Sequence, residues 1–134
     1  MENRVFRHSI RVPYAHVDQM GYVYYANYFV YFEMARSELL REAGMPYGDM
    51  EERGVMLPVV TAHCEYRKPA HFDDLLNIET RCTEIKGIRL RIEYVISRGD
   101  SAIVTGFTEH VCVAIKDGKV LKPIPELKRL VSLV

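Results

Sequence analysis

NYFVYFEMARSELLREAG, residues 27–44, decides the fold, because its apolar residues recur at spacings of three and four. The recurring positions are Tyr28, Phe32, Ala35, Leu39 and Ala43. This period predicts an amphipathic helix over residues 27–43 whose apolar stripe packs against a core. Gly44 suits the left-handed position after a helix, and Pro46 cannot continue the turn, so the helix is expected to end there.

The start of this helix leaves two alternatives. Asn27 is an acceptable N-cap, and the alternative is a start one turn earlier, near Tyr24 or Tyr25. Upstream, residues 6–14 alternate apolar and polar side chains, which predicts a half-buried strand. Residues 15–23 carry no period and predict an ordered loop.

Downstream of the helix, four more segments are expected to be strands, and the first three show the period of two that indicates a strand. They lie near residues 60–66, 76–83, 88–97 and 103–115, after a linker at residues 45–58. In the last of them, residues 103–115, both the odd-numbered and the even-numbered positions are largely apolar. A strand with two apolar faces is expected at the centre of a sheet. Residues 116–119, KDGK, predict a hairpin turn into a final short strand, and a short amphipathic helix is expected after Pro125.

The order of elements is one strand, one long helix and then a run of strands, without alternating βαβ units. It predicts an α+β fold in which one long central helix is wrapped by an antiparallel β-sheet. With 134 residues the chain has the length of one ordinary domain. We therefore predict a single domain over residues 1–134.

Composition excludes several classes of protein. Hydrophobic residues make up 49% of the chain and charged residues 27%, the balance of a globular protein. The formal net charge is zero, so no global field attracts nucleic acid or an anionic membrane. The amino end has no apolar run of a secretory signal, and no stretch approaches the roughly 18 apolar residues of a membrane span. We therefore expect a cytoplasmic protein without membrane insertion.

Cysteine and histidine spacing gives no metal signature. Cys64, Cys82 and Cys112 lie far apart within predicted strands, so we expect reduced structural thiols. The five histidines are scattered without an H-x-x-x-H or H-E-x-x-H spacing. We predict neither a metal site nor a cofactor.

The loop before the helix carries the residues best suited to chemistry, Asp18 and Gly21. A helix N-terminus presents unpaired N–H groups and a partial positive charge, which stabilise an oxyanion. Tyr25 is the candidate donor through its backbone, and Asp18 is the candidate carboxylate that attacks a carbonyl carbon or activates a water. A thioester suits such sparse machinery, because a thiol leaving group with a pKa of about 8.5 needs no general acid. The alternative is that both residues serve only as turn and capping residues.

Two segments of the chain form a pattern that extends beyond single residues. The first is DQMGYVYYANY, residues 18–28, followed by FEMAR and a helix that ends in glycine. The second is EYRKPAHFDDL, residues 65–75, where a strand ends at Pro-Ala and the next begins after an acidic pair. Together they resemble the hydroxybenzoyl-CoA thioesterase group of hotdog-fold proteins, and the resemblance covers roughly residues 4–131.

The resemblance implies a hotdog fold with active sites at the interface of two subunits, and either a homodimer or a homotetramer of paired dimers. It places the family's catalytic aspartate on Asp18, the glycine of its D-x-x-G motif on Gly21 and its oxyanion amide on Tyr25. The similar Tol-Pal-associated acyl-CoA thioesterases often have histidine where this chain has Tyr25. A backbone role tolerates either residue, whereas a mechanism that needs an imidazole there does not apply. His16 is left outside the catalytic set.

Acyl-CoA is the substrate that the resemblance implies. Arg67, Lys68, Arg89 and Arg91 are candidates for the CoA phosphates, and the alternative for each is a solvated side chain on an exposed strand. The expected substrate-binding residues within the first motif are Gly21, Val23, Tyr24, Asn27 and Tyr28.

The resemblance therefore implies an acyl-CoA thioesterase acting on a short-chain or aromatic acyl-CoA, with Asp18 as nucleophile or general base. One alternative is a non-catalytic hotdog protein that binds acyl-CoA or an acyl carrier, against which Asp18 argues. Another is a hotdog hydratase or dehydratase, which is expected to pair an aspartate with a histidine and fits the D-x-x-G-x-V pattern less well. Nucleic-acid binding is disfavoured by the neutral charge.

Overall fold

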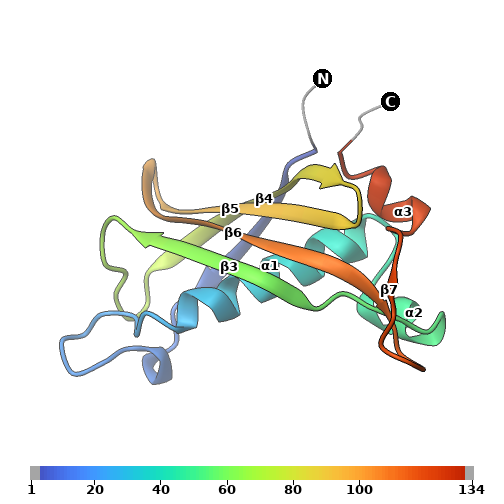
Figure 1. The fold of residues 1–134 in the computed structure, drawn as a ribbon. Helices are drawn as coiled ribbons and strands as arrows, with labels where there is room; N and C mark the ends of the chain where they lie inside the picture. Colours follow the sequence, from blue (N-terminus) through green and yellow to red (C-terminus); the bar gives the residue numbers. More distant parts are fainter. Residues whose placement is uncertain (1–3, 132–134) are drawn as a thin grey trace.

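The structure, a computed structural model, describes residues 4–131 of the chain (Figure 1). The predicted domain limits at residues 1 and 134 lie outside the described residues. The helices are α1 (Asn27–Glu42), α2 (Tyr47–Glu52) and α3 (Pro125–Lys128), and a 3₁₀ turn covers Tyr14–His16. The strands are β1 (Phe6–Arg11), β2 (Val55–Met56), β3 (Val59–Tyr66), β4 (Leu75–Lys86), β5 (Arg89–Arg98), β6 (Ser101–Ala114) and β7 (Val120–Leu121).

The described strands form one antiparallel sheet in the order β1-β4-β5-β6-β2, and β3 and β7 also pair with β6. Because β6 pairs with β5 along one edge and with β3 along the other, the prediction of a central strand at residues 103–115 is confirmed. The sheet curves around α1, which runs along one of its faces (Figure 1). The predicted α+β architecture, with one long helix against an antiparallel sheet, is confirmed.

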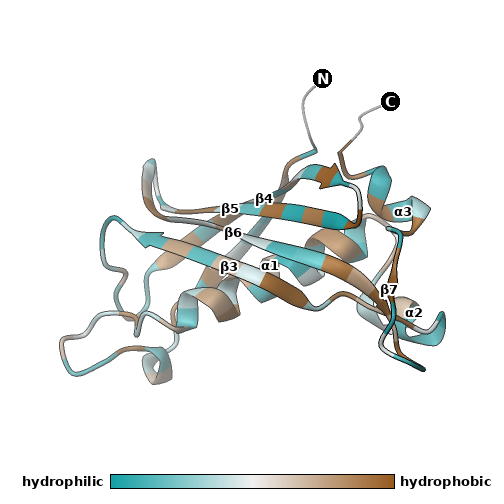
Figure 2. Cartoon of the chain, in the orientation of Figure 1, coloured by the Kyte–Doolittle hydropathy of each residue, from teal (hydrophilic) through white to brown (hydrophobic). Residues whose placement is uncertain are grey.

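The core lies between α1 and the face of the sheet that α1 covers. Along β5 the alternation of side chains directs Leu90, Ile92, Tyr94 and Ile96 into it, each at most 1% exposed. The same alternation appears as bands of opposite hydropathy along β5 (Figure 2). The Phe32 ring of α1 stacks on Tyr94 with 4.3 Å between the ring centroids. This stack fits because the neighbouring position on β6 is Gly106, which has no side chain.

Helix α1 agrees with the predicted range 27–43, but its N-cap is Ala26 rather than Asn27. The Asn27 side chain does not cap the helix, because its amide donates to the carbonyl oxygen of His16 at 3.1 Å. The alternative start one turn earlier is also wrong. At the other end Gly44 adopts a φ of 83°, the left-handed conformation predicted for it.

Two predicted boundaries are wrong. Strand β1 ends at Arg11 rather than Tyr14, since Pro13 has no N–H to donate and Tyr14 begins the 3₁₀ turn. The predicted linker at residues 45–58 contains α2 and β2. With six and two residues, these elements are too short to show a period in the sequence.

The described residues agree with the expectations on cysteine. Cys82 and Cys112 are buried, Cys64 is partly buried, and all three are free thiols within strands. No helix of residues 4–131 is long and apolar enough to cross a membrane. Within the same part of the chain, no group of three or more His, Cys, Asp and Glu residues is arranged to hold a metal ion.

A chain of hydrogen bonds crosses the core from α1 to β6. Arg36 donates through Nε to the Tyr47 hydroxyl at 2.8 Å and through Nη1 to the Tyr94 hydroxyl at 3.1 Å. The Tyr94 hydroxyl lies 2.7 Å from Thr108 Oγ1, which in turn lies 2.8 Å from His110 Nε2. These partners satisfy polar groups that would be costly to bury alone.

His110 makes the fold sensitive to acid. Its side chain is fully buried, and burial together with the charge of Arg36 lowers its pKa to about 4. A histidine in an unfolded chain titrates near about 6.5, so between these values only the unfolded chain binds the proton. The contribution of His110 to the free energy of unfolding is therefore complete above about pH 6.5. Roughly 3 kcal/mol of it is lost as the pH falls to about 4.

We expect urea unfolding to give a lower free energy at pH 4.5 than at pH 7.5. His110→Gln should remove most of this difference, because an amide does not titrate, although the variant is less stable at both pH values. An undiminished pH dependence in the variant would show that carboxylates such as Asp74 cause the loss instead.

Candidate active site

Asp18 lies in a tight turn between β1 and α1. Its Oδ1 accepts hydrogen bonds from the backbone N–H groups of Met20 at 2.9 Å and Tyr22 at 3.1 Å. The Asp18 N–H donates to the Tyr22 carbonyl at 2.7 Å, and Gly21 closes the turn with a φ of 80°, a value that favours glycine. The carboxylate is thereby held in one orientation. Within the described part of the chain, Oδ2 has no hydrogen-bond partner.

The backbone just before α1 offers free donors. The Tyr24 N–H donates to the His16 carbonyl and the Asn27 N–H donates to the Tyr24 carbonyl, each at 2.9 Å. Between them, the N–H groups of Tyr25 and Ala26 make no hydrogen bond to any residue of the range 4–131. They lie where the positive end of the helix dipole favours a negative charge.

A pocket of about 320 Å³ joins the Asp18 turn to the start of α1. Its lining comes from these two segments and from the end of β3: Asp18, Met20, Tyr22, Val23, Tyr25, Tyr28, Tyr66, Arg67, Lys68 and Pro69. In Figure 1 the loop before α1 and the connection after β3 lie at the same end of the sheet, opposite α2 and β7.

Three tyrosines give this pocket an aromatic wall. The Tyr66 ring lies 5.4 Å from the Tyr28 ring and 6.3 Å from the Tyr25 ring, measured between centroids. Burial raises the pKa of Tyr66 to about 12 and also raises the pKa of Tyr28, so both hydroxyls keep their protons at neutral pH. The Tyr66 hydroxyl donates to the Tyr25 carbonyl at 3.4 Å and so ties the end of β3 to the start of α1.

The connection between β3 and β4 holds the Asp18 turn from the other side. The Val23 N–H donates to the Ala70 carbonyl at 2.8 Å, and Tyr22 forms an isolated β-bridge with His71. The β3–β4 connection, which is distant in sequence, thus fixes the turn that carries Asp18.

Asp74 anchors this connection in turn. Its Oδ2 accepts hydrogen bonds from the His71 N–H at 2.9 Å and from Arg98 Nη1 at 2.8 Å. Burial acts to raise the pKa of Asp74, but these two hydrogen bonds outweigh it and lower the pKa. Asp74 is therefore ionised at neutral pH and keeps its partners in place.

The structure brings together six of the residues predicted for the site: Asp18, Val23, Tyr25, Tyr28, Arg67 and Lys68. Gly21, Tyr24 and Asn27 adjoin the pocket along the chain without lining it. Arg89 and Arg91 lie on β5 beside a separate, smaller pocket of about 90 Å³, so a single chain does not bring them to Asp18.

Sequence reasoning missed Tyr66, Met20, Tyr22 and Pro69 as lining residues. Tyr66 had a usable signal, since it is the last residue on the apolar parity of β3 and directly precedes the basic pair. Met20 and Tyr22 flank the glycine of the turn, but a loop without a period does not reveal which side chains face inward.

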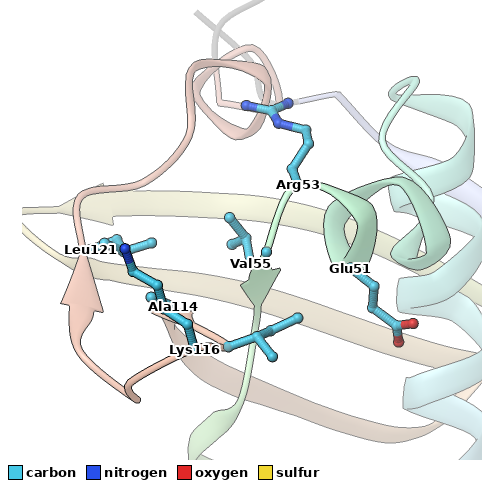
Figure 3. A pocket seen from close by; sticks show the side chains of 8 residues that line it. Glu51, Arg53, Val55, Ala114, Lys116 and Leu121 are labelled. Atoms are coloured by element: carbon cyan, nitrogen blue, oxygen red, sulfur yellow. The ribbon is translucent and has the colours of Figure 1, made fainter.

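A larger pocket of about 470 Å³ lies at the opposite end of the molecule, between α2, β2 and the β6–β7 turn. Val55, Ala114 and Leu121 give it a mostly apolar lining (Figure 3). Arg53 points toward α3, where it pairs with Glu126. This pocket is remote from Asp18 and from the free N–H groups before α1.

Comparison with known proteins gives a family match over most of the chain. Residues 12–130 match the thioesterase-like superfamily. The acyl-CoA thioester hydrolase YbgC of Escherichia coli O6:H1 is 30% identical over 132 residues, which cover 98% of this chain and 97% of that protein. The acyl-CoA thioesterase YbgC of Haemophilus influenzae is 33% identical over 89% of this chain and 86% of its own length.

Solved structures agree. The DHNA-CoA thioesterase of Staphylococcus aureus superposes with a TM-score of 0.87 at 26% identity, over 94% of this chain and 87% of that one. The predicted hotdog fold and the predicted family of thioester hydrolases are therefore confirmed. The chain belongs to the thioesterase-like superfamily.

Proposed function

We propose that this protein hydrolyses an acyl-CoA thioester, with Asp18 as its catalytic carboxylate and the Tyr25 N–H as an oxyanion donor. One observation carries the proposal. Two residues that line the same pocket carry groups without a hydrogen-bond partner among residues 4–131: Oδ2 of the oriented Asp18 carboxylate, and the Tyr25 N–H at the helix start. These are the two groups that attack at a carbonyl carbon requires.

Two routes lead from this arrangement to the same products. As a general base, Asp18 takes a proton from water while the water oxygen bonds to the thioester carbonyl carbon. As a nucleophile, Asp18 bonds to that carbon itself, and water then hydrolyses the resulting anhydride. In both routes the Tyr25 N–H stabilises the oxyanion, the carbon–sulfur bond breaks, and coenzyme A leaves as a thiolate beside the free acid.

Pocket shape supports a short-chain or aromatic acyl group. About 320 Å³ leaves room for a compact group, and the wall of Tyr25, Tyr28 and Tyr66 suits apolar or planar surface. Arg67 and Lys68 lie at the same pocket and are placed to meet phosphates of coenzyme A. Arg89 and Arg91 would need a second subunit to reach the same substrate.

We propose a homodimer or homotetramer in the cytoplasm as the working form. Strand β3 has one unpaired edge in the described chain, and Val59 and Val60 on it are each 45% exposed. Apolar edge strands invite a further strand, which a second copy of the chain can supply. Helix α1 presents two further exposed apolar residues, Val30 and Met34.

The competing function is a non-catalytic acyl-CoA binding protein. It is favoured by the two turn hydrogen bonds of Asp18 Oδ1, which give the carboxylate a structural role. Asp18 Oδ2 and the Tyr25 N–H, neither of which has a hydrogen-bond partner within residues 4–131, favour catalysis, because a turn alone needs neither group.

Release of free thiol from short-chain, long-chain and aromatic acyl-CoAs tests the proposal, with the oligomer size of each sample measured by light scattering. We expect turnover of short-chain or aromatic substrates, with a lower KM than for the same acyl groups on N-acetylcysteamine, which lacks phosphates. Acyl-CoA binding without turnover on any substrate would favour the binding protein.

A further inference from the structure

His16 lies at the joint between the Asp18 turn and the start of α1. Its carbonyl oxygen accepts hydrogen bonds from the Tyr24 N–H at 2.9 Å and from the Asn27 side-chain amide at 3.1 Å. Its ring Nδ1 lies 2.8 Å from the Tyr31 hydroxyl. Both the main chain and the side chain of this one residue are therefore tied to α1.

Tyr31 is a rigid anchor for this contact. Its side chain is 1% exposed and packs edge-on against Tyr28, with 5.9 Å between ring centroids. Burial raises the pKa of Tyr31 to about 12, so the hydroxyl keeps its proton at neutral pH. Asn27 and Tyr31 are four residues apart, which places them one above the other on α1, where together they hold His16.

The hydrogen bonds of His16 to Tyr31 and Asn27 affect the candidate site because of where His16 lies in the chain. His16 precedes Asp18 by two residues, and its hydrogen-bond partner Tyr24 directly precedes Tyr25. The same residue is thus bonded to the segment that carries the carboxylate and to the segment that carries the free N–H.

We infer that His16 is a positioning residue that fixes the Asp18 carboxylate relative to the Tyr25 N–H by bonding to Tyr31 and Asn27; this rests on the proposed thioesterase function. His16 does not line the pocket, so its loss should leave substrate binding nearly intact. It should lower the rate of the chemical step, because small displacements of reacting groups are costly.

Tyr31→Phe isolates the contact, because it keeps the ring against Tyr28 and removes only the hydroxyl. We expect kcat to fall about tenfold with KM within about twofold of the native value, and the same for His16→Ala. The double variant should lose no more than either single variant, because both remove one interaction. His16→Asn should recover most of the rate, since its amide can occupy the place of Nδ1.

Tyr94→Phe is the matched control, a buried tyrosine that loses a hydrogen-bonded hydroxyl away from the pocket. It should lower stability and leave kcat unchanged. A fall in kcat for Tyr94→Phe equal to that for Tyr31→Phe, or additive losses in the double variant, would overturn the positioning role.

Amide hydrogen exchange gives a readout that does not depend on activity. In Tyr31→Phe the Tyr24 amide should exchange faster, because its acceptor on His16 is less firmly held, while amides of β5 stay protected. If the Tyr24 amide exchanged at the native rate in Tyr31→Phe, the positioning role of His16 would be refuted, even in an active enzyme. A native protein without turnover would instead refute the thioesterase, and the exchange result would still decide whether His16 holds this segment.

Discussion

Asp18→Asn should lower kcat by between about a hundredfold and ten-thousandfold on the best acyl-CoA substrate, the range expected for loss of a positioned base. An amide neither takes a proton from water nor attacks a thioester carbon at a useful rate. We place the phosphates of coenzyme A at Arg67 and Lys68 rather than at Asp18, so KM should change far less than kcat. Thiol release under steady-state conditions, on samples of equal oligomer size, measures both constants.

The fold should survive this change. The asparagine oxygen can still accept the N–H groups of Met20 and Tyr22 that now bond to Oδ1 of Asp18. Asp117→Asn is the matched control, because Asp117 Oδ1 accepts the Lys119 N–H in a comparable turn remote from the pocket. The two variants should unfold at similar temperatures while only Asp18→Asn loses turnover. Full activity in Asp18→Asn would reduce the residue to a turn former.

Gly106→Ala should destabilise the protein by about 3 kcal/mol, lowering Tm by roughly 10 °C in a domain of this size. A Cβ at this position would lie 2.4 Å from the His63 carbonyl oxygen and 2.7 Å from the Phe32 ring. The first contact is with the backbone of β3, so relief requires a strand to move. Phe32 is also held, because it stacks on Tyr94. Thermal and urea unfolding measure the loss.

Gly48→Ala is the matched control for this prediction. Gly48 lies in α2, and a Cβ there meets nothing within 4 Å. Alanine favours a helix over glycine by up to about 1 kcal/mol, so this variant should equal or exceed the native protein in stability. Native stability in Gly106→Ala would mean that β3 and Phe32 adjust freely and that Gly106 is not closely packed against them.

The contiguous part of the site could be predicted from the sequence, because a single motif before α1 contains both Asp18 and Tyr25. Sequence patterns do not place residues where a choice between strand faces or an approach from a distant segment is needed. Arg89 and Arg91 lie on the same face of β5, as the alternation along the strand predicts. The alternation does not tell which pocket that face borders. Tyr66 reaches the site because β3 pairs with β6, a register that no local pattern reveals.

Local competition explains the smaller errors. Asn27 has the side chain of an N-cap, yet its amide bonds to the His16 carbonyl across the joint, and Ala26 takes the cap position instead. An N-cap rule considers only the residues at the helix end, so it does not include the carbonyl of His16, eleven positions earlier in the chain. The same applies to α2, whose six residues are held by contacts with β2 and α1 rather than by a period.

The sheet order also sets when the site can form during synthesis on the ribosome. Strand β1 pairs with β4, as in Phe6 with Thr80, and β3 pairs with β6, as in Tyr66 with Val104. When Asp18, Tyr25 and Tyr66 have left the ribosome, neither β1 nor β3 yet has a partner strand. Such long-range pairings form slowly, and the unpaired strands stay exposed meanwhile. The candidate pocket is therefore encoded by residues 18–69 but assembled only when the last long strand, β6, emerges.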